Sequence, residues 1–183
     1  EPLRRVSILP RGMALGATQQ TLTEDRHIAT QPELEAKLRV LLAGYAAENL
    51  YFGNVSSGSE NDLKQATEIA YKMVAQYGMS DRIGPLYLEH HTEHPFLGQR
   101  LATDGSVSEA TIRAIEEEAT RLLKKAAGEA TAIIVRHRHA LDRLVDALLE
   151  QETLERPAIL QLFEEAESAP PDGEIHTGSA PHH

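Results

Sequence analysis

A run of apolar side chains between Ser108 and Ile134 constrains the fold of this chain more than any other feature. Its positions lie three or four residues apart, which predicts one long amphipathic helix capped at Ser106 or Ser108. Ala, Leu, Glu and Arg recur at helical spacing elsewhere in the chain, so we expect a mainly helical domain. The predicted apolar stripe consists of Ile112, Ile115, Ala119, Leu122, Leu123, Ala126, Ile133 and Ile134.

The same periodicity predicts four further helices. The first begins at Pro32 and ends at Gly53, with a stripe that starts at Leu34. The second follows several candidate N-caps in 56–59 and stops at Gly78. The last two cover about 141–151 and the residues after Pro157. The second helix is expected to place Leu63, Ala66, Ala70, Met73, Val74 and Tyr77 on one face.

Strand patterns are few and short. Residues 5–9 alternate between two faces before Pro10, and residues 14–22 alternate less regularly. A third short strand is expected at 86–88, within a long connection. The predicted fold class is therefore mainly α, a helical bundle with a small β element of about two short strands near the N-terminus.

Charge and composition exclude several classes of function. The 183 residues carry a formal net charge of −10, whose field repels nucleic acid phosphates and anionic lipid. We therefore expect no nucleic acid partner and no direct membrane contact from this segment. The absence of cysteine excludes disulfides, thiolate metal sites and a cysteine nucleophile. The length favours one main folding unit.

Two groups of histidines are candidate metal ligands. His90, Glu93 and His94 form the pattern H-x-x-E-H, in which two imidazoles one helical turn apart bind zinc and the carboxylate acts as base. Pro95 follows at once and no helical periodicity surrounds the motif, so a solvated loop is the favoured interpretation. His137 and His139 are two residues apart and point to different faces of a helix, which argues against a shared metal.

Asp62 lies in the first turn of the second predicted helix, beside its apolar stripe. A carboxylate at that position is favoured by the helix dipole and faces toward any adjoining site. From the local pattern alone, the usual role of such an aspartate is a structural N-terminal charge.

Many short motifs occur in one order along the chain, and together they resemble the C-terminal peptidase domain of FtsH-type ATP-dependent zinc metalloproteases. The resemblance covers about residues 2–165. In chain order the motifs are 5–12, 14–16, 24–26, 46–48, 52–53, 57–58, 61–63, 66–67, 77–81, 84–86, 96–98, 148–150 and 152–154.

The resemblance implies a peptidase domain over 1–167, followed by a polar tail over 168–183. It implies a homo-hexameric ring beneath an AAA+ ATPase module of the same polypeptide, with ATP and Mg in that module and Zn in the peptidase. The partners would be threaded or unfolded protein substrates. The parent protein would sit at the cytoplasmic face of a membrane, or an organellar equivalent, through an anchor outside this chain.

The resemblance also implies roles for particular residues. Asp62 matches the acidic zinc ligand, and an edge strand matches the platform for the substrate backbone. No HExxH occurs in residues 1–183, so the catalytic Glu is expected upstream and the chain alone is expected to be inactive. The alternative is a catalytically dead relative that keeps the helical body for assembly. The residues of the matching strand are Ala14, Leu15, Gly16, Ala17, Thr18, Gln19 and Gln20.

Two short segments depart from the family pattern. Ala43-Gly44-Tyr45 stands where the family commonly has Gly-Gly-Arg, and Ser57-Gly58-Ser59 stands where it has Thr-Gly-Ala. The second departure lies just before Asp62, and it places a serine where the family has alanine.

Overall fold

The computed structural model describes residues 3–9, 17–20, 28–88 and 107–168. The chain divides into two compact units. Arg26–Arg136 form the first, here called the helical unit. Glu1–Asp25 together with His137–His183 form the second, here called the mixed unit, so it draws on both ends of the chain.

The helical unit begins with α1 (Gln31–Phe52), as the sequence predicted. The Thr30 backbone N–H and hydroxyl both donate to the Glu33 carboxylate, at 2.7 and 2.8 Å, which fixes the start of the helix. Gly53 ends α1 with a φ of 66°, in the left-handed region that glycine adopts without strain.

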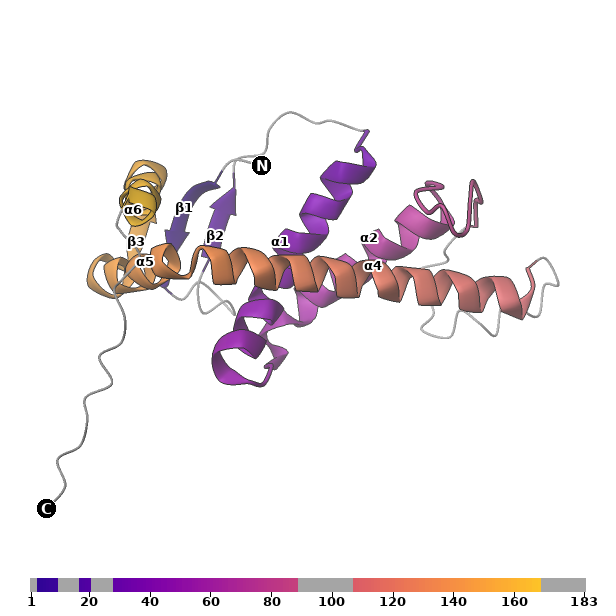
Figure 1. Cartoon of the computed structure of the whole chain (residues 1–183), viewed down its shortest axis with the longest axis horizontal. Coiled ribbons are helices and arrows are strands. Elements are labelled where there is room, and N and C mark those ends of the chain that lie inside the picture. The colour runs from indigo at the N-terminus through magenta and orange to yellow at the C-terminus, as the bar shows by residue number, and fades with distance from the viewer. Residues whose placement is uncertain (1–2, 10–16, 21–27, 89–106, 169–183) are drawn as a thin grey trace, which may run out of the picture. The chain divides into compact units, whose positions relative to one another are not determined.

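Two further helices pack against α1 (Figure 1). They are α2 (Glu60–Ala75), which follows the 3₁₀ turn η1 (Ser57–Ser59), and the long helix α4 (Glu109–Arg136). All three helices carry alanines at buried positions, so many of the side chains between the helices are short. The buried core consists of Leu38, Leu42, Ala66, Ala70, Met73, Val74, Ala75, Ile115, Ala119, Leu122 and Ala126.

Most members of the predicted apolar stripes in these helices are buried or half-buried, but three of them are exposed. Leu63 and Ile133 are 37% and 47% exposed, and Tyr77 is 52% exposed. Tyr77 lies beyond the end of α2, because the helix stops at Ala75 and Gly78 turns the chain with a φ of 63°. Spacing alone did not show where the helix stops.

No strand forms at residues 86–88, so that prediction was wrong. Instead of pairing as a strand, Leu86 and Leu88 pack against the core of the helical unit. The Leu88 backbone N–H donates to the Ala75 carbonyl at 2.6 Å, which covers the C-terminal end of α2.

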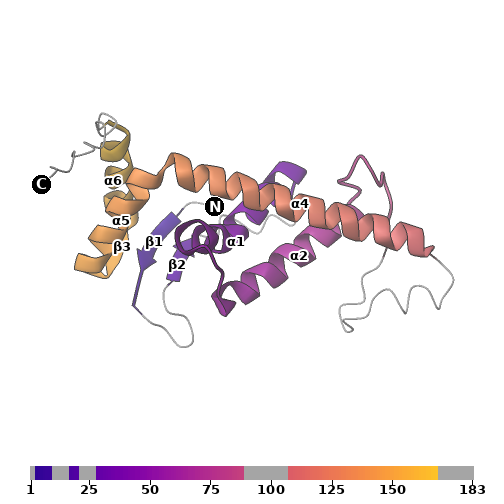
Figure 2. The same cartoon turned by 60° about the horizontal axis from the view of Figure 1, so that its bottom comes forward.

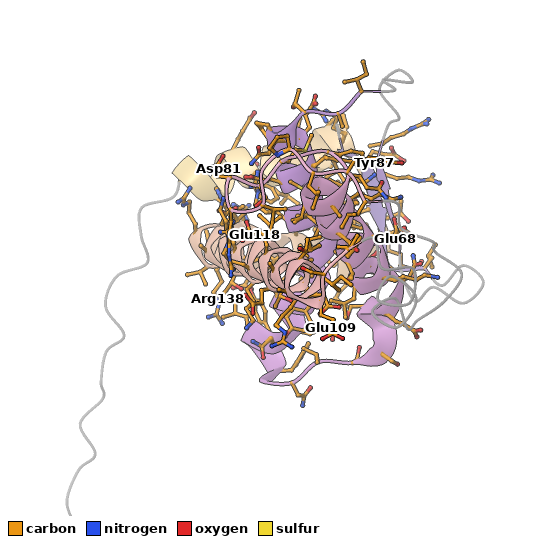
Figure 3. The ribbon with its side chains drawn as sticks, turned by 90° about the vertical axis from the view of Figure 1, so that its right-hand side faces the viewer. Glu68, Asp81, Tyr87, Glu109, Glu118 and Arg138 are labelled. Carbon is orange, nitrogen blue, oxygen red and sulfur yellow. The ribbon has the colours of Figure 1, made fainter. Side chains whose placement is uncertain are left out.

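A buried carboxylate on α4 fastens the segment after α2. Glu118 is 2% exposed and accepts hydrogen bonds from the Ser80 hydroxyl at 3.0 Å and from two Arg121 nitrogens at 2.8 Å. Figure 3 shows Glu118 on the same side of the helical unit as Asp81, the residue after Ser80. The hydrogen bonds from Arg121 are the largest cause of a lowered pKa of Glu118, burial opposes them, and the Ser80 bond adds to them.

Replacing Glu118 with glutamine is expected to lower the free energy of unfolding at neutral pH by about 1–3 kcal/mol. Because the pKa of Glu118 is lower in the folded state, its carboxylate stabilises the fold fully above about pH 5. This stabilisation is lost as the pH falls through the folded-state pKa. The difference between parent and variant should therefore shrink between about pH 7 and about pH 3, measured by urea unfolding. The neighbouring exposed Glu117, paired with Arg82, supplies the control Glu117→Gln. If the free energies of unfolding of the parent and Glu118→Gln changed with pH in parallel, the lowered pKa of Glu118 would be contradicted.

The mixed unit contains a three-stranded antiparallel sheet in the order β2-β1-β3. The strands are β1 (Leu3–Ser7), β2 (Ala17–Gln20) and β3 (Thr153–Glu155). The first two correspond to the predicted strands, although β1 begins and ends two residues earlier than predicted. The sequence did not predict β3, which brings residues near the two chain ends into register, with Val6 opposite Leu154.

Two helices complete the mixed unit, α5 (Arg138–Gln151) and α6 (Arg156–Ser168), and both were predicted. Along the chain β3 lies between them, and Figure 2 shows all three in orange to yellow. Leu148, Leu154 and Ile159 form the buried core of this unit, with Leu3, Val6 and Phe163 packed against it. With five helices and three short strands in its described residues, the chain is mainly α, as predicted.

Candidate functional site

Asp62 lies in the first turn of α2, with Glu60 in the same turn. Its side chain is half-buried, whereas Glu60 is exposed. The backbone N–H groups and the dipole of a helix favour an anion at this end. Asp62 thus places a carboxylate on a regular helix, and groups on helices are held more precisely than groups on loops.

The turn before α2 is fastened to α1 by one carboxylate. The Ser56 backbone N–H donates to Glu48 Oε2 at 2.6 Å, and the Ser56 hydroxyl donates to Glu48 Oε1 at 2.9 Å. The Gly58 backbone N–H donates in turn to Ser56 Oγ at 3.1 Å. These bonds fix the path of the chain into η1 and α2, and hence the first turn that carries Asp62.

Ser59 differs from its neighbours, because its hydroxyl is buried without a partner. The residue is 5% exposed, and its Oγ makes no hydrogen bond within the described structure. It precedes α2 as N-cap, yet its side chain does not cap the helix.

Replacing Ser59 with alanine is expected to raise the free energy of unfolding by about 1 kcal/mol, because it removes a buried hydroxyl that has lost its water. Ser57→Ala is the matched control, since Ser57 is exposed. Both variants are compared with the parent by urea unfolding followed by circular dichroism. A loss of stability in Ser59→Ala would show that the hydroxyl has a partner in solution.

The described residues do not make a complete zinc site. No group of three His, Cys, Asp or Glu side chains that could hold a metal occurs in residues 3–9, 17–20, 28–88 and 107–168. A catalytic zinc site uses three protein ligands and an open position. Asp62 has the donor chemistry of one such ligand, and no further His, Cys, Asp or Glu completes a group of three with it in these ranges.

The predicted histidine motif, His90, Glu93 and His94, lies outside the described residues. His137 and His139 lie at the start of the mixed unit's first helix. The ring of His137 packs near Phe163, with 6.3 Å between ring centroids.

The predicted substrate strand is partly described. Ala17, Thr18, Gln19 and Gln20 form β2, while Ala14, Leu15 and Gly16 lie outside the described residues. β2 is an edge of the sheet, because β1 is its one neighbour in the strand order. An edge strand presents unpaired backbone groups, which an added peptide strand can pair with. β2 belongs to the mixed unit and Asp62 to the helical unit.

Two features of the site were not predicted from the sequence. The contact between Glu48 and Ser56 spans eight residues and a turn, so no helical spacing rule indicates it. The buried state of Ser59 depends on packing around the turn and has no local pattern. Glu48 belongs to the motif 46–48 that carried part of the resemblance, and this was the available indication of its importance.

One structural observation bears on the membrane. In the part of the chain that the structure describes, every helix is too short or too polar to cross a bilayer.

Sequence comparison identifies relatives over nearly the whole chain. FtsH of Syntrophotalea carbinolica, an ATP-dependent zinc metalloprotease, is 41% identical over 181 residues, covering 95% of this chain and 28% of that protein. FtsH of Nitrosococcus oceani is 41% identical over 173 residues, covering 94% and 27%. FtsH 4 of Sphaerobacter thermophilus is 42% identical over 171 residues, covering 93% and 25%.

The chain therefore spans about a quarter of the length of these curated relatives. The family model for peptidase family M41 matches residues 1–162, which include Asp62, the Glu48 turn and all three strands. These matches confirm the resemblance to FtsH-type enzymes. The chain belongs to peptidase family M41.

Proposed function

We propose that this chain is part of the peptidase domain of an ATP-dependent, membrane-associated zinc metalloendopeptidase that degrades unfolded or threaded proteins. The observation that carries the proposal is the placement of Asp62. Within the segment that matches family M41, it is a half-buried carboxylate in the first turn of a packed helix. The names of the relatives, ATP-dependent zinc metalloproteases, support the same activity.

Asp62 would hold the metal together with two imidazoles. In the FtsH family these come from an HExxH helix that precedes the segment resembled here, and its Glu takes the proton from water. Zinc, when bound, would supply Lewis-acid chemistry, polarising the scissile carbonyl and lowering the pKa of water. The role of this chain's residues is to present one anionic oxygen from a fixed position, with the Glu48 turn holding the helix start.

The substrate would bind by strand addition along residues 14–20. β2 is an edge strand, so the backbone groups on its outer side are available to a substrate in extended conformation. Main-chain hydrogen bonds carry little side-chain information, which suits an enzyme that degrades many sequences. The proposal extends to a peptidase domain over 1–167 with a tail over 168–183.

The assembly we propose follows from the same family membership. An AAA+ module of the same polypeptide, using ATP and Mg, would thread substrate into a homo-hexameric peptidase ring that works in protein quality control. The parent protein would be anchored at the cytoplasmic face of a membrane. Ring formation would make use of apolar side chains that the structure leaves exposed, such as Val145 and Leu149 at 48% and 70%.

The test compares two proteins, the 183-residue chain and an extended protein. The extended protein is this chain preceded by its own upstream coding sequence as far as an HExxH helix. We expect the extended protein to bind zinc and to cleave unfolded casein in a reaction that a chelator abolishes and zinc restores. The 183-residue chain should do neither, and chelator-sensitive cleavage by it would overturn the placement of the missing ligands upstream.

The same comparison decides the alternative. If the upstream sequence contains no HExxH and the longer protein binds no zinc, the chain is a catalytically dead relative that acts in assembly. In that case sedimentation should show oligomers of the parent protein without peptidase activity.

A further inference from the structure

The side chain of Ser7, the last residue of β1, is buried and fully hydrogen-bonded. Ser7 is 7% exposed, and its hydroxyl donates to the Glu152 carbonyl at 3.3 Å. Its Oγ accepts from the Leu9 backbone N–H at 3.2 Å and lies 2.8 Å from Thr153 Oγ1. A serine hydroxyl has one proton, and Glu152 receives it, so Thr153 is the donor to Ser7. Ser7 therefore joins the end of β1 to the corner where α5 ends and β3 begins.

Glu152, at this corner, has a backbone conformation that residues other than glycine rarely adopt. Its φ is 58°, in the left-handed region. Such a conformation is costly and persists where the surrounding contacts fix it. Here the Glu152 N–H donates to the Leu148 carbonyl at 2.8 Å, and its carbonyl accepts from the Ile8 backbone N–H at 3.0 Å as well as from Ser7. The end of β1 therefore holds the corner from which β3 starts.

Ser7 also lies in the middle of a row across the sheet, opposite Ala17 of β2 and opposite Thr153 of β3. Since β3 has three residues, its backbone pairing with β1 is short, and cross-strand side-chain pairs help to set its register. The two hydroxyls meet in this register, whereas a shift by one residue would turn the side chains of β3 to the other face. β1 is the one neighbour of β2 in the strand order. The position of β2 therefore depends on β1, which the Ser7 hydroxyl ties to β3.

We propose that Ser7 and Thr153 are positioning residues for β2, and that they fix the edge of the sheet to which a substrate strand is added. This inference rests on the proposed function, in which the substrate binds along residues 14–20. An edge strand binds an extended peptide through its backbone groups, and an edge that is already fixed loses less freedom on binding than a loose one. Ser7 is buried and Thr153 lies on the opposite side of β1 from β2, so both act through the pairing of β1 with β2.

The experiment measures KM and kcat of the extended protein for a short fluorogenic peptide that needs no unfolding. Ser7→Ala is expected to raise KM about 10-fold and to leave kcat unchanged, because the loss of about one net hydrogen bond changes a binding equilibrium by roughly that factor. Thr153→Val keeps the shape of the side chain and removes the donor to Ser7, so it should raise KM in the same way. Ser7→Thr keeps the hydroxyl and should restore the KM of the parent.

Two control variants separate positioning from a general loss of stability. Ile159→Val truncates a side chain in the buried core of the mixed unit, where Ile159 is 2% exposed, and so destabilises the same unit by another route. Glu152→Gly removes an exposed carboxylate and suits the left-handed conformation, but it keeps the carbonyl that accepts from Ser7. KM should stay at the parent value in both. An equal rise of KM in Ile159→Val and Ser7→Ala would overturn the proposal.

A double-mutant cycle tests whether the two hydroxyls act as one pair. If they do, the KM of the double variant Ser7→Ala/Thr153→Val should equal that of Ser7→Ala alone. Increases of KM that multiply would mean that the two residues act separately, and they would overturn the proposal. An unchanged KM in Ser7→Ala, or a KM in Ser7→Thr as high as in Ser7→Ala, would overturn it as well.

A readout that needs no peptidase activity separates this inference from the proposed function. In ¹⁵N–¹H spectra of the 183-residue chain, Thr153→Val should shift or broaden the amide signals of Thr18 and Gln19 in β2, although β1 lies between β3 and β2. Ile159→Val should leave these signals in place. Unmoved β2 signals in Thr153→Val sink the inference whether or not the extended protein is active. If the signals move but the parent extended protein shows no chelator-sensitive cleavage, the link from Thr153 to β2 holds and the proposed function fails.

Discussion

Replacing Asp62 with asparagine is expected to weaken zinc binding by the extended protein by more than the roughly 100-fold that the loss of an outer-shell partner can cost. Asparagine keeps the size of the side chain but presents a neutral oxygen. A neutral amide is a poorer zinc ligand than the carboxylate, which is among the oxygen donors zinc accepts. Peptidase activity on unfolded casein should fall in parallel, because the reaction would depend on the bound metal.

The control for this prediction lies in the same helical turn. Glu60→Gln removes one negative charge from the start of α2 but changes an exposed side chain, so zinc affinity should remain close to that of the parent. If Asp62→Asn binds zinc as tightly as the parent, the ligand set lies elsewhere. The H-x-x-E-H motif would then be the candidate, with loss of binding expected in His94→Ala.

The largest effect on stability is expected from Leu38→Ala in the helical unit. Leu38 is 1% exposed and belongs to the core formed by α1, α2 and α4. Truncating a fully buried leucine to alanine costs about 2–5 kcal/mol, because the lost transfer free energy adds to that of the cavity left behind. Urea unfolding followed by circular dichroism measures the change.

Val40 offers a matched comparison on the same helix. It is 56% exposed, so Val40→Ala should change the free energy of unfolding by no more than about 0.5 kcal/mol. The two substitutions have similar chemistry and neighbouring positions, and burial is the main difference between them. A loss below about 1 kcal/mol in Leu38→Ala would contradict the placement of α1 against the core.

Local sequence patterns predicted the helices because their causes are local. The stripe that contains Ile115 and Leu122 repeats at helical spacing, and Pro32 and Gly53 limit α1 from within a few residues. Each of these features acts through neighbours within one or two turns. The fold class could therefore be predicted before any contact between helices was known.

Features that depend on distant partners could not be predicted in this way. β3 has three residues and becomes a strand through pairing with β1, about 150 positions earlier in the chain. Leu86 and Leu88 alternate like a strand but serve to cover the end of α2. The burial of Glu118 likewise depends on Ser80, which α2 and the following turn bring to it.

The residues of the candidate site also include some that the sequence predicted and others that depend on contacts between elements. The resemblance assigned Asp62 and residues 14–20, since motifs carry residue identity. It did not assign Glu48 as the partner of Ser56, because that contact depends on where α1 ends relative to α2. For Ser59 the sequence showed the departure from the family pattern. The structure was needed to show that its buried hydroxyl makes no hydrogen bond within the described residues.

The strand order β2-β1-β3 has a consequence for how the protein forms during synthesis. β3 follows β1 by about 150 residues, so the sheet stays incomplete until the segment that contains β3 has been translated. The helical unit is continuous in sequence and needs no such delay. We therefore expect a fragment that ends near residue 136 to hold a folded three-helix core while β1 has β2 but still lacks β3.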